Sequence, residues 1–280
     1  MSEDQPGRRD IPIRDLPQDL VADVHQKIRL HSVAMAISLA DSADPFPCSG
    51  TLVEINGVVG VLTARHVWTD LLKVARTVGL LVGGHEPYWI KPDVLRTFGP
   101  CADGVLPGTS VQIPDLAFVR IPPVARGRIE AAKKVFYSLD VRRRDPQMDF
   151  FSERGFRVLA GSPQALFDSK TSMVGSLLYD TTVERRVEQG DWDYIFTNLN
   201  LPQNPALPKA YGGLSGGGIW RAAFYVTEDG TEFLVEKASR DILLSGVAFY
   251  ETDLPGRQII GHGPRSLYTT LYDHIGNEIT

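Results

Sequence analysis

The chain has few cysteines and no long apolar run. Only two of its 280 residues are cysteines, Cys48 and Cys101, so at most one disulfide can form. No stretch approaches the ~20 consecutive apolar residues that a membrane-spanning helix needs. Residues 1–20 are polar and interrupted by proline, without the apolar core of a signal peptide. We therefore expect two free thiols in a reducing compartment and a cytoplasmic protein.

The sequence also lacks an excess of positive charge and a metal-binding motif. Its formal net charge is -5, which argues against a nucleic-acid binder because phosphate contacts need a basic surface. The main basic run, Arg142 to Arg144, is followed by Asp145, and such runs are typically solvated. The six histidines are scattered and neither cysteine belongs to a CxxC pair. We expect no metal, no cofactor, and no nucleic-acid or membrane partner.

What the chain does contain is a series of short β-like runs separated by Gly, Pro, Asn and Asp. They lie at 32–40, 50–55, 58–64, 77–83 and 115–121, and again at 156–161, 176–183, 193–199, 217–226, 231–236 and 242–250. Asn56-Gly57 and the segment 228–231 are hairpin signals. Segments 17–30, 126–139 and 264–275 have helical patterns.

Two groups of short strands indicate an all-β fold of two antiparallel barrels, because closure removes exposed strand edges. A helix is expected at each end of the chain. The predicted division is an N-terminal lead and helix, a first barrel, a helical linker, a second barrel and a C-terminal helix; the segments are 1–31, 32–125, 126–145, 146–263 and 264–280.

The stretch "YGGLSGGGIWRA" at 211–222 places Ser215 among five glycines. A serine attacks a carbonyl only when a base, a carboxylate that orients the base and donors for the oxyanion lie nearby. His66 follows an apolar strand in "VVGVLTARHV", and Asp115 begins another in "DLAFVRI". Taken alone, His66 reads as a capping or half-buried histidine and Asp115 as a turn residue.

Together, "LTARHV", "DLAFVRI" and "GLSGGG" resemble, in this order, the three signature blocks of the chymotrypsin/trypsin-like serine proteases. The three residues lie 49 and 100 positions apart, close to the spacing of that double-barrel family. The stretch "CSGTLVEINGVVGVLTARHV" also resembles the family's strand-turn-strand approach to its histidine. The likeness covers residues 32–275 and is of the bacterial, intracellular type without the usual disulfides.

The resemblance implies a fold of two six-stranded-type barrels and a role for each block. His66 would be the general base, Asp115 its orienter and Ser215 the nucleophile. The N–H groups of Gly213 and Ser215 would form the oxyanion hole, for which a glycine-rich loop supplies the required backbone angles.

Two other loop types share part of this pattern. The loop matches G-x-S-x-G, the nucleophile elbow of α/β-hydrolases, but that reading needs an acid and then a histidine after the serine, on a parallel sheet. His262 and His274 keep it open. A phosphate-binding loop is disfavoured because no Lys follows "GLSGGG".

The chain departs from the family at two positions. Leu214 stands where many secreted members carry an Asp that pairs with a newly cleaved N-terminus, so we expect no activation by N-terminal trimming. Cys48 lies where a family cysteine often occurs, but the position of its usual partner holds Val67.

The sequence gives little information about which substrate residues the site would prefer. The resemblance places Lys209 at the base of the first specificity pocket, where it would favour an acidic substrate residue or point to solvent. It places Phe249, Tyr250 and Glu251 on the pocket wall, where bulky rings would narrow the pocket and Glu251 would pair with Lys209. His262 is expected near the opposite wall.

The leading interpretation is a serine endopeptidase acting on a protein or peptide through an acyl-enzyme. Narrow specificity or a regulatory protein partner would restrain it, with docking surfaces at 17–30 and 84–114. The alternatives are a catalytically silent protease fold that serves as a binding or scaffolding module, and an esterase-type acyl hydrolase on the same three residues.

Overall fold

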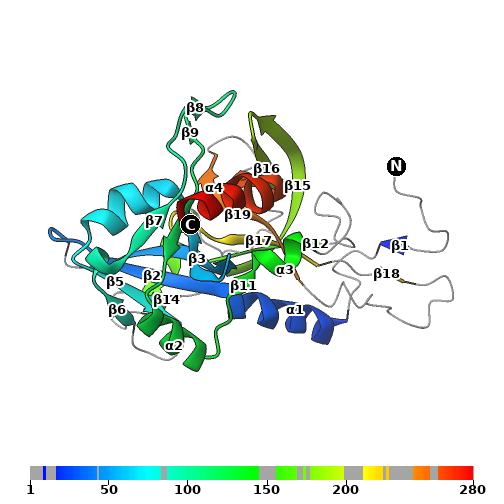
Figure 1. The fold of residues 1–280 in the computed structure, drawn as a ribbon. Helices are drawn as coiled ribbons and strands as arrows, with labels where there is room; N and C mark the ends of the chain where they lie inside the picture. Colours follow the sequence, from blue (N-terminus) through cyan, green and yellow to red (C-terminus); the bar gives the residue numbers. More distant parts are fainter. Residues whose placement is uncertain are drawn as a thin grey trace.

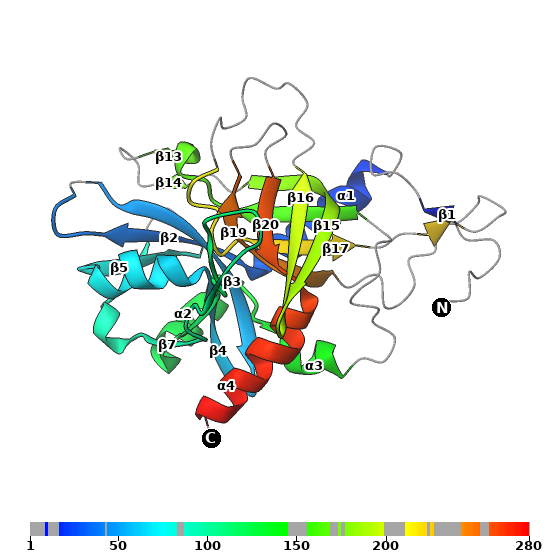
Figure 2. The ribbon, with the colours of Figure 1, turned by 90° about the horizontal axis from the view of Figure 1, so that it is seen from above.

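The chain folds into two groups of antiparallel strands with a helix near each end (Figures 1 and 2). The structure is a computed structural model. It describes residues 9–10, 17–42, 44–82, 87–144, 156–168, 173–174, 177–198, 211–222, 225–226, 242–252 and 258–279. Within these ranges, no helix combines the length and the hydropathy needed to cross a membrane.

The first group is an open eight-stranded sheet. Seven strands follow the order β6-β5-β2-β3-β4-β10-β7, and β11 pairs in parallel with β3. Their bounds are β2 Ser32–Ser38, β3 Phe46–Ile55, β4 Val58–Thr63, β5 Thr77–Leu81, β6 Tyr88–Ile90, β7 Arg96–Phe98, β10 Ala117–Arg120 and β11 Tyr137–Ser138. The path does not return on itself, so this sheet is a half-barrel.

The two outer strands explain why the sheet stays open. β6 and β7 have three residues each, and Pro87 and Pro92 lie on either side of β6. Proline has no N–H to donate to a neighbouring strand, and short strands are a common way to end a sheet. The 3₁₀ turn η4 (Pro92–Val94) joins β6 to β7.

The turn between β3 and β4 is the predicted hairpin. Ile55 pairs with Val58, and the two residues between them, Asn56 and Gly57, have φ of 50° and 73°. Both central residues of a type I′ turn need positive φ, which Asn and Gly adopt most readily. The hairpin signal in the sequence is therefore confirmed.

The second group is a closed six-stranded barrel in the order β12-β15-β16-β20-β19-β17. Its strands are β12 Phe156–Gly161, β15 Leu177–Gln189, β16 Trp192–Asn198, β17 Gly218–Ala222, β19 Leu243–Glu251 and β20 Gln258–His262. Register shifts occur in the β15–β16, β17–β19 and β19–β20 pairs. Such bulges bend strands, which helps a sheet close.

Three two-stranded pairs lie outside these sheets. They are β1 (Arg9–Asp10) with β18 (Tyr225–Val226), β8 (Gly104–Val105) with β9 (Gln112–Ile113), and β13 (Phe167–Asp168) with β14 (Met173–Val174). The β8–β9 pair falls within the long 84–114 segment, which therefore has regular structure in part.

Helices cover the ends of the sheets. α1 (Gln18–His31) buries Val24 and Ile28. α2 (Pro123–Ala131) buries Ala125 and Ile129 in the core of the first sheet. The remaining helical segments are η2 (Val67–Leu71), η3 (Leu72–Val74), α3 (Leu139–Arg143), η5 (Gln164–Leu166), η6 (Ser266–Leu271) and α4 (Tyr272–Ile279).

The C-terminal helical segment is attached to both groups of strands. Ser266 donates its N–H to Asp193 Oδ1 at 2.6 Å and its hydroxyl to the Asp193 carbonyl at 2.8 Å, which fixes η6 to β16. Tyr272 donates its hydroxyl to Asn56 Oδ1 at 2.7 Å, at the β3–β4 turn. The segment therefore bridges the two groups, as Figure 2 also shows.

The sequence-based fold class, a double barrel of antiparallel strands with terminal helices, is confirmed, with the first barrel open rather than closed. The helix expected over 126–139 is α2, which begins earlier, at Pro123, and ends at Ala131. Lys133 has φ of 62°, outside helical geometry. The strand predicted at 231–236 and the hairpin at 228–231 lie outside the described residues, and the division into five segments stays a prediction.

Candidate active site

Strand pairing brings His66 and Asp115 together. β4 ends at Thr63 and β10 begins at Ala117, and these two residues are paired in the antiparallel ladder. The chain leaving β4 and the chain entering β10 therefore lie at the same end of the sheet. His66 is three residues past that pair and Asp115 two residues before it.

Two hydrogen bonds join these residues. The His66 backbone N–H donates to Asp115 Oδ1 at 2.9 Å, and His66 Nδ1 lies 2.6 Å from Asp115 Oδ2. The carboxylate side chain is 12% exposed and the imidazole 43% exposed. The carboxylate thus holds the ring at one nitrogen while the other side of the ring stays accessible.

The environment of His66 favours its protonated form. Burial by itself lowers the pKa of His66, but the hydrogen bond and the charge of Asp115, with a smaller contribution from the charge of Asp70, outweigh burial and raise the pKa above its ordinary value. An imidazole whose pKa is raised in this way accepts a proton more readily, which suits a general base.

Ser215 lies on a loop that an apolar side chain anchors. Leu214 is 3% exposed and belongs to a buried cluster of the second barrel that includes Leu159, Ile195 and Ile219. The side chain of Leu214 thus anchors the loop in the core of the barrel. This is the position at which many secreted members of the resembling family carry an Asp that forms an ion pair. Ser215 itself stays half-buried.

Glycine is required on both sides of the serine. Gly213 and Gly216 have φ of 92° and 93°, in the region that L side chains rarely adopt. A Cβ on Gly216 would lie 2.2 Å from the carbonyl oxygen of Ser49, so the two chain segments approach too closely for any side chain. The glycine-rich pattern therefore serves both the turn and the close contact with the first sheet.

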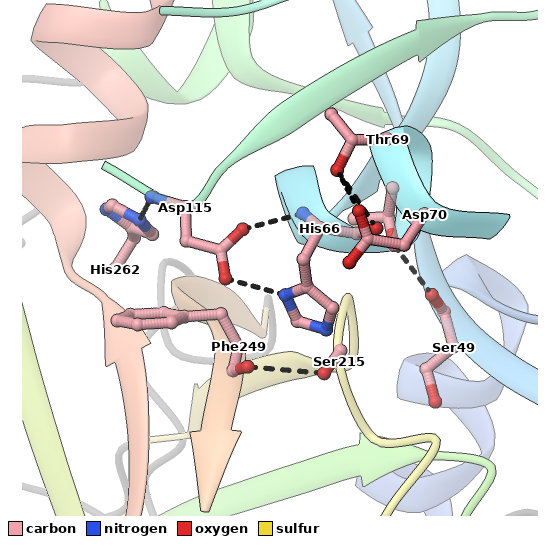
Figure 3. Close-up of polar contacts among 9 residues, drawn as sticks. Ser49, His66, Thr69, Asp70, Asp115, Ser215, Phe249 and His262 are labelled. Carbon is pink, nitrogen blue, oxygen red and sulfur yellow. Dashed lines mark hydrogen bonds and ion pairs between the residues drawn. The ribbon is translucent and has the colours of Figure 1, made fainter. Parts of the chain in front are cut away.

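His66 and Ser215 line one pocket of about 360 Å³ between the two groups of strands. Figure 3 shows the imidazole edge opposite Asp115 facing Ser215. The Ser215 hydroxyl donates to the carbonyl oxygen of Phe249 at 3.2 Å. Within the described residues it makes no hydrogen bond to His66. Catalytic hydrogen bonds are often longer without a bound substrate.

Two backbone donors of the loop are unused. Among the described residues, neither the Gly213 N–H nor the Ser215 N–H donates to a protein acceptor. The carbonyl of Gly212 accepts from the N–H of Gln164 at 2.6 Å. Because a trans peptide directs its N–H opposite to its carbonyl, the Gly213 N–H points away from Gln164.

Of the residues predicted to set specificity, Phe249, Tyr250 and Glu251 line the pocket. Glu251 accepts a hydrogen bond from the backbone N–H of Tyr211 at 3.0 Å. Tyr250 is 38% exposed, whereas Phe249 is buried. Lys209 lies outside the described residues, so its predicted pairing with Glu251 stays a prediction.

The expectation for His262 needs correction. Its side chain is fully buried and does not line the pocket. Nε2 accepts a hydrogen bond from the Asp115 backbone N–H at 3.1 Å, on the side of Asp115 away from His66 (Figure 3). Burial lowers the pKa of His262 to about 3, so the ring is neutral and able to accept. His262 is the last residue of the apolar strand "QIIGH", and that context signals burial rather than exposure.

Sequence reasoning also missed Ser49. This buried residue of β3 donates its hydroxyl to the Gly213 carbonyl at 2.6 Å and accepts the Ser162 N–H at 2.8 Å. The only sequence signal was its place in "CSGTLVEINGVVGVLTARHV", the stretch that resembles the family's approach to its histidine, and this gave Ser49 no role.

The two cysteines are free, with Cys48 buried and Cys101 exposed. Burial raises the pKa of the Cys48 thiol. In the part of the chain that the structure describes, no three His, Cys, Asp or Glu side chains are arranged to hold a metal ion.

Solved structures similar to this chain include proteases and an inactivated protease paralogue. The inactivated protease paralogue S-I1 of the scabies mite is 14% identical, with 90% of this chain and 96% of that chain covered and a TM-score of 0.50. The serine endoprotease from Yersinia pestis is 16% identical, with 92% and 67% covered and a TM-score of 0.47.

The catalytically active tobacco etch virus protease is 12% identical, with 94% of this chain and 82% of that chain covered and a TM-score of 0.46. No protein-family model matches the chain, and no curated protein matches it. At such low identity, likeness to the first of these structures supports the fold alone. Any activity has to be argued from the site.

Proposed function

We propose that the chain is a serine endopeptidase that hydrolyses a protein or peptide through an acyl-enzyme. His66 is the general base, Asp115 orients it, and Ser215 is the nucleophile. The N–H groups of Gly213 and Ser215 form the oxyanion hole. One observation carries the proposal: the pocket that holds Ser215 also holds an imidazole whose far nitrogen is bonded to a buried carboxylate at 2.6 Å.

The reaction uses these groups in turn. Rotation about the Cα–Cβ bond of Ser215 moves its hydroxyl from the Phe249 carbonyl toward His66 Nε2, which takes the proton as Oγ attacks the substrate carbonyl. The new oxyanion accepts hydrogen bonds from the two free N–H groups. His66 then gives its proton to the leaving amine. Water, deprotonated by His66, attacks the acyl-enzyme carbonyl. The acyl–oxygen bond to Ser215 then breaks, the acid leaves, and His66 returns the proton to Ser215 Oγ.

Asp115 has a positioning and electrostatic part in this scheme. Its bond to Nδ1 keeps the proton on that nitrogen, which leaves Nε2 free to accept from Ser215. It also stabilises the imidazolium that forms transiently. The raised pKa of His66 is the ground-state sign of the same interaction.

The pocket beside Ser215 would bind the substrate residue next to the cleaved bond. Aliphatic and aromatic side chains, including Leu214, Ala248, Phe249 and Ile259, form much of its lining, and Glu251 adds a carboxylate. Lys209 remains our candidate for an acidic preference at the first specificity position. A peptide library would reveal that preference as enrichment of Asp or Glu before the cleaved bond, and a profile without it would exclude the role.

We also propose that the enzyme works in the cytoplasm under narrow specificity or the control of a protein partner, with α1 and the 84–114 segment as docking surfaces. Rapid cleavage of generic unfolded proteins by the isolated chain would contradict that control.

A fluorophosphonate probe tests the central assignment because it reacts only with an activated serine. We expect the wild-type chain to be labelled, with the adduct located on Ser215 by peptide mass spectrometry, and Ser215→Ala to be unlabelled. Ser42→Ala, which removes an exposed hydroxyl bonded to the Asp44 carbonyl, is the control and should label like the wild type.

The catalytically silent binding module is the second candidate, and the bond from Ser215 to the Phe249 carbonyl favours it. A wild-type chain that folds but takes no label would support this module over the enzyme. A labelled chain that cleaves activated esters and no peptide in a broad library would support the esterase.

A further inference from the structure

Two hydrogen bonds cross between the two groups of strands, one in each direction. Ser49, on β3 of the open sheet, donates to the Gly213 carbonyl in the nucleophile loop of the barrel. His262, on β20 of the barrel, accepts from the Asp115 N–H, two residues before β10 of the open sheet. Each group of strands thus holds the segment of the other that bears a proposed catalytic residue.

The Ser49 hydroxyl has both of its roles filled. It donates to the Gly213 carbonyl at 2.6 Å and accepts the Ser162 N–H at 2.8 Å. The next residue but one of that turn, Gln164, donates to the Gly212 carbonyl. The Gly213 N–H shares a peptide plane with the Gly212 carbonyl, so the bond from Gln164 fixes its direction. Ser49 supports this arrangement from both sides, because it holds the next peptide group at the Gly213 carbonyl and the Ser162 end of the turn that carries Gln164.

Space around Gly213 is also restricted. A Cβ there would lie 2.9 Å from Gln164 N, 3.0 Å from the Ser162 carbonyl and 3.1 Å from the Pro47 carbonyl. The loop therefore packs against backbone from both groups of strands. Without the Ser49 hydroxyl, the Gly213 carbonyl and the Ser162 N–H would both lose their partner, and the peptide groups around Gly213 would be held less firmly.

His262 occupies an aromatic surrounding. The rings of Trp192, Tyr194 and Phe249 lie with centroids 5.5, 5.0 and 4.9 Å from its own. Nε2 accepts from Asp115, whereas the buried Nδ1 has no hydrogen-bond partner among the described residues. A phenylalanine would suit these surroundings without burying an unpaired nitrogen, so the bond to Asp115 is what explains an imidazole here.

We propose that Ser49 and His262 are positioning residues of the active site, Ser49 by orienting the Gly213 oxyanion donor and His262 by fixing the segment that carries Asp115. This inference rests on the proposed function. It assigns a separate task to each residue: Ser49 acts on the stabilisation of negative charge, and His262 acts on the base through Asp115. The two tasks predict different changes in one assay.

The assay is the rate of fluorophosphonate labelling of the full chain as a function of pH. For the wild type, the rate rises as His66 loses its proton and then reaches a plateau. Ser49→Ala should lower the plateau by roughly 10- to 100-fold, less than the ~10²–10³-fold loss expected when an oxyanion donor is removed outright. It should leave the midpoint of the rise where it is, because His66 and Asp115 are untouched.

Ser245→Ala is the matched control for Ser49. Ser245 is also a buried serine, and its hydroxyl donates to the Ile219 carbonyl at 2.9 Å, away from the loop. We expect a plateau within about twofold of the wild type. Ser49→Cys, which keeps a weak donor, should fall between Ser49→Ala and the wild type. A Ser49→Ala plateau equal to that of Ser245→Ala would overturn the role of Ser49.

His262→Phe should behave differently. The substitution leaves the Asp115 N–H without its acceptor and so loosens the hydrogen bond between Asp115 and His66. We expect the midpoint of the labelling rate to move to lower pH and the plateau to be lower. Its melting temperature should stay within about 3 °C of the wild type, because one unpaired buried nitrogen replaces another. His262→Gln retains an acceptor oxygen and should restore part of the plateau.

The control for His262 is His31→Phe. His31 also stacks on an aromatic ring, that of Trp220, and bonds a backbone carbonyl, that of Val135, but it touches neither Asp115 nor the loop. We expect its pH midpoint to match the wild type. An unshifted midpoint in His262→Phe would overturn the role of His262. Absence of labelling in the wild type would contradict the proposed function itself, whereas a labelled wild type with unaffected variants contradicts this inference alone.

Discussion

The open sheet and the closed barrel contribute to the site by different means. In the open sheet, His66 and Asp115 lie beside two paired strands, and the register Ala117 to Thr63 sets their separation. In the barrel, Ser215 lies on a loop, and buried packing of Leu214 together with positive φ at Gly213 sets its position. The proposed base is placed by a ladder of backbone hydrogen bonds and the proposed nucleophile by an anchored loop.

The two halves should therefore differ in their sensitivity to substitution. A strand ladder tolerates changes of single side chains, because many backbone hydrogen bonds hold it together. A short loop depends on a few contacts, which here include the apolar anchor Leu214 and the hydroxyls of Ser49 and Thr51. We therefore expect most damaging substitutions in the open sheet to act through chemistry, and those around the loop to act through position and stability together.

The largest expected effect is that of Asp115→Asn, which would test whether the open sheet acts through chemistry. The amide keeps the size of the side chain but no longer favours the proton on Nδ1 of His66. We expect labelling to slow by roughly 10⁴-fold with little change in melting temperature. The rate constants of fluorophosphonate labelling for the variant and the wild type would measure the loss.

Asp70→Asn is the matched control. The charge of Asp70 also raises the pKa of His66, through space and more weakly than Asp115. Its removal should move the pH midpoint slightly downward and change the plateau by no more than about threefold. Equal losses in both variants would mean that charge alone, and not the bond to Nδ1, carries the effect.

The second prediction concerns the anchor of the barrel loop. Leu214→Ala should lower the free energy of unfolding by about 2–5 kcal/mol, the usual cost of a buried leucine, and should also slow labelling because the loop loses its support. Denaturant unfolding and labelling rates measure the two effects. Leu52→Ala, at a fully buried position of the open sheet, should cost similar stability while the folded protein labels at the normal rate.

The third prediction is that the stability of the protein depends on pH in opposite ways through His262 of the barrel and His66 of the open sheet. Because the folded-state pKa of His262 is depressed to about 3, the unfolded chain binds this proton more readily, and stability is lost as pH falls from 6.5 toward 3. The slope is at most ~1.4 kcal/mol per pH unit for one proton. Thermal unfolding across this range should show a shallower decline in His262→Phe.

His66 has the opposite sign. Its folded-state pKa is raised, so its contribution to stability is present below pH 6.5 and disappears as pH rises through the folded value. Activity follows the neutral form, so labelling should rise through a midpoint above 6.5. A midpoint clearly below 6.5 would contradict the pairing with Asp115.

The smallest expected effect is at the hairpin of the open sheet. Gly57 has φ of 73° with open space where a Cβ would lie, so Gly57→Ala should cost about 1–2 kcal/mol of backbone strain and leave labelling unchanged. Gly213→Ala combines a similar φ with contacts at 2.9–3.1 Å. Gly213→Ala should lower the free energy of unfolding by more than Gly57→Ala does and should also abolish most labelling. Equal stability and labelling of the two variants would contradict the proposed difference between the open sheet and the barrel.

Much of the fold was predictable because local signals were strong. Short apolar runs separated by turn residues, the Asn56-Gly57 turn and the helical patterns at 17–30 and 264–275 correspond to observed elements. β20 was missed because "QIIGH" is short and lacks a clear alternation, and the linker helix was placed too late because Pro123 was not taken as its first residue. The open state of the first sheet depends on which strands find partners, which local patterns do not encode.

For the candidate site, the sequence indicated the proposed chemical groups but not their surroundings. Glycines around Ser215 and an aspartate before an apolar strand were visible as patterns. The error at His262 has a clear origin: a histidine after a strand reads equally well as exposed or buried, and only its contacts with Trp192, Tyr194 and Asp115 decide.

The order of residues along the chain was enough to predict many of the elements, the Asn56-Gly57 turn and the side chains that are chemically able to act, because propensity, periodicity and turn geometry are local. Contacts between residues 49 and 213, or between 115 and 262, were decided only when the two groups of strands packed together. A hydrogen bond forms over about 3 Å in space, and nothing in the spacing of residues more than a hundred positions apart specifies such a distance.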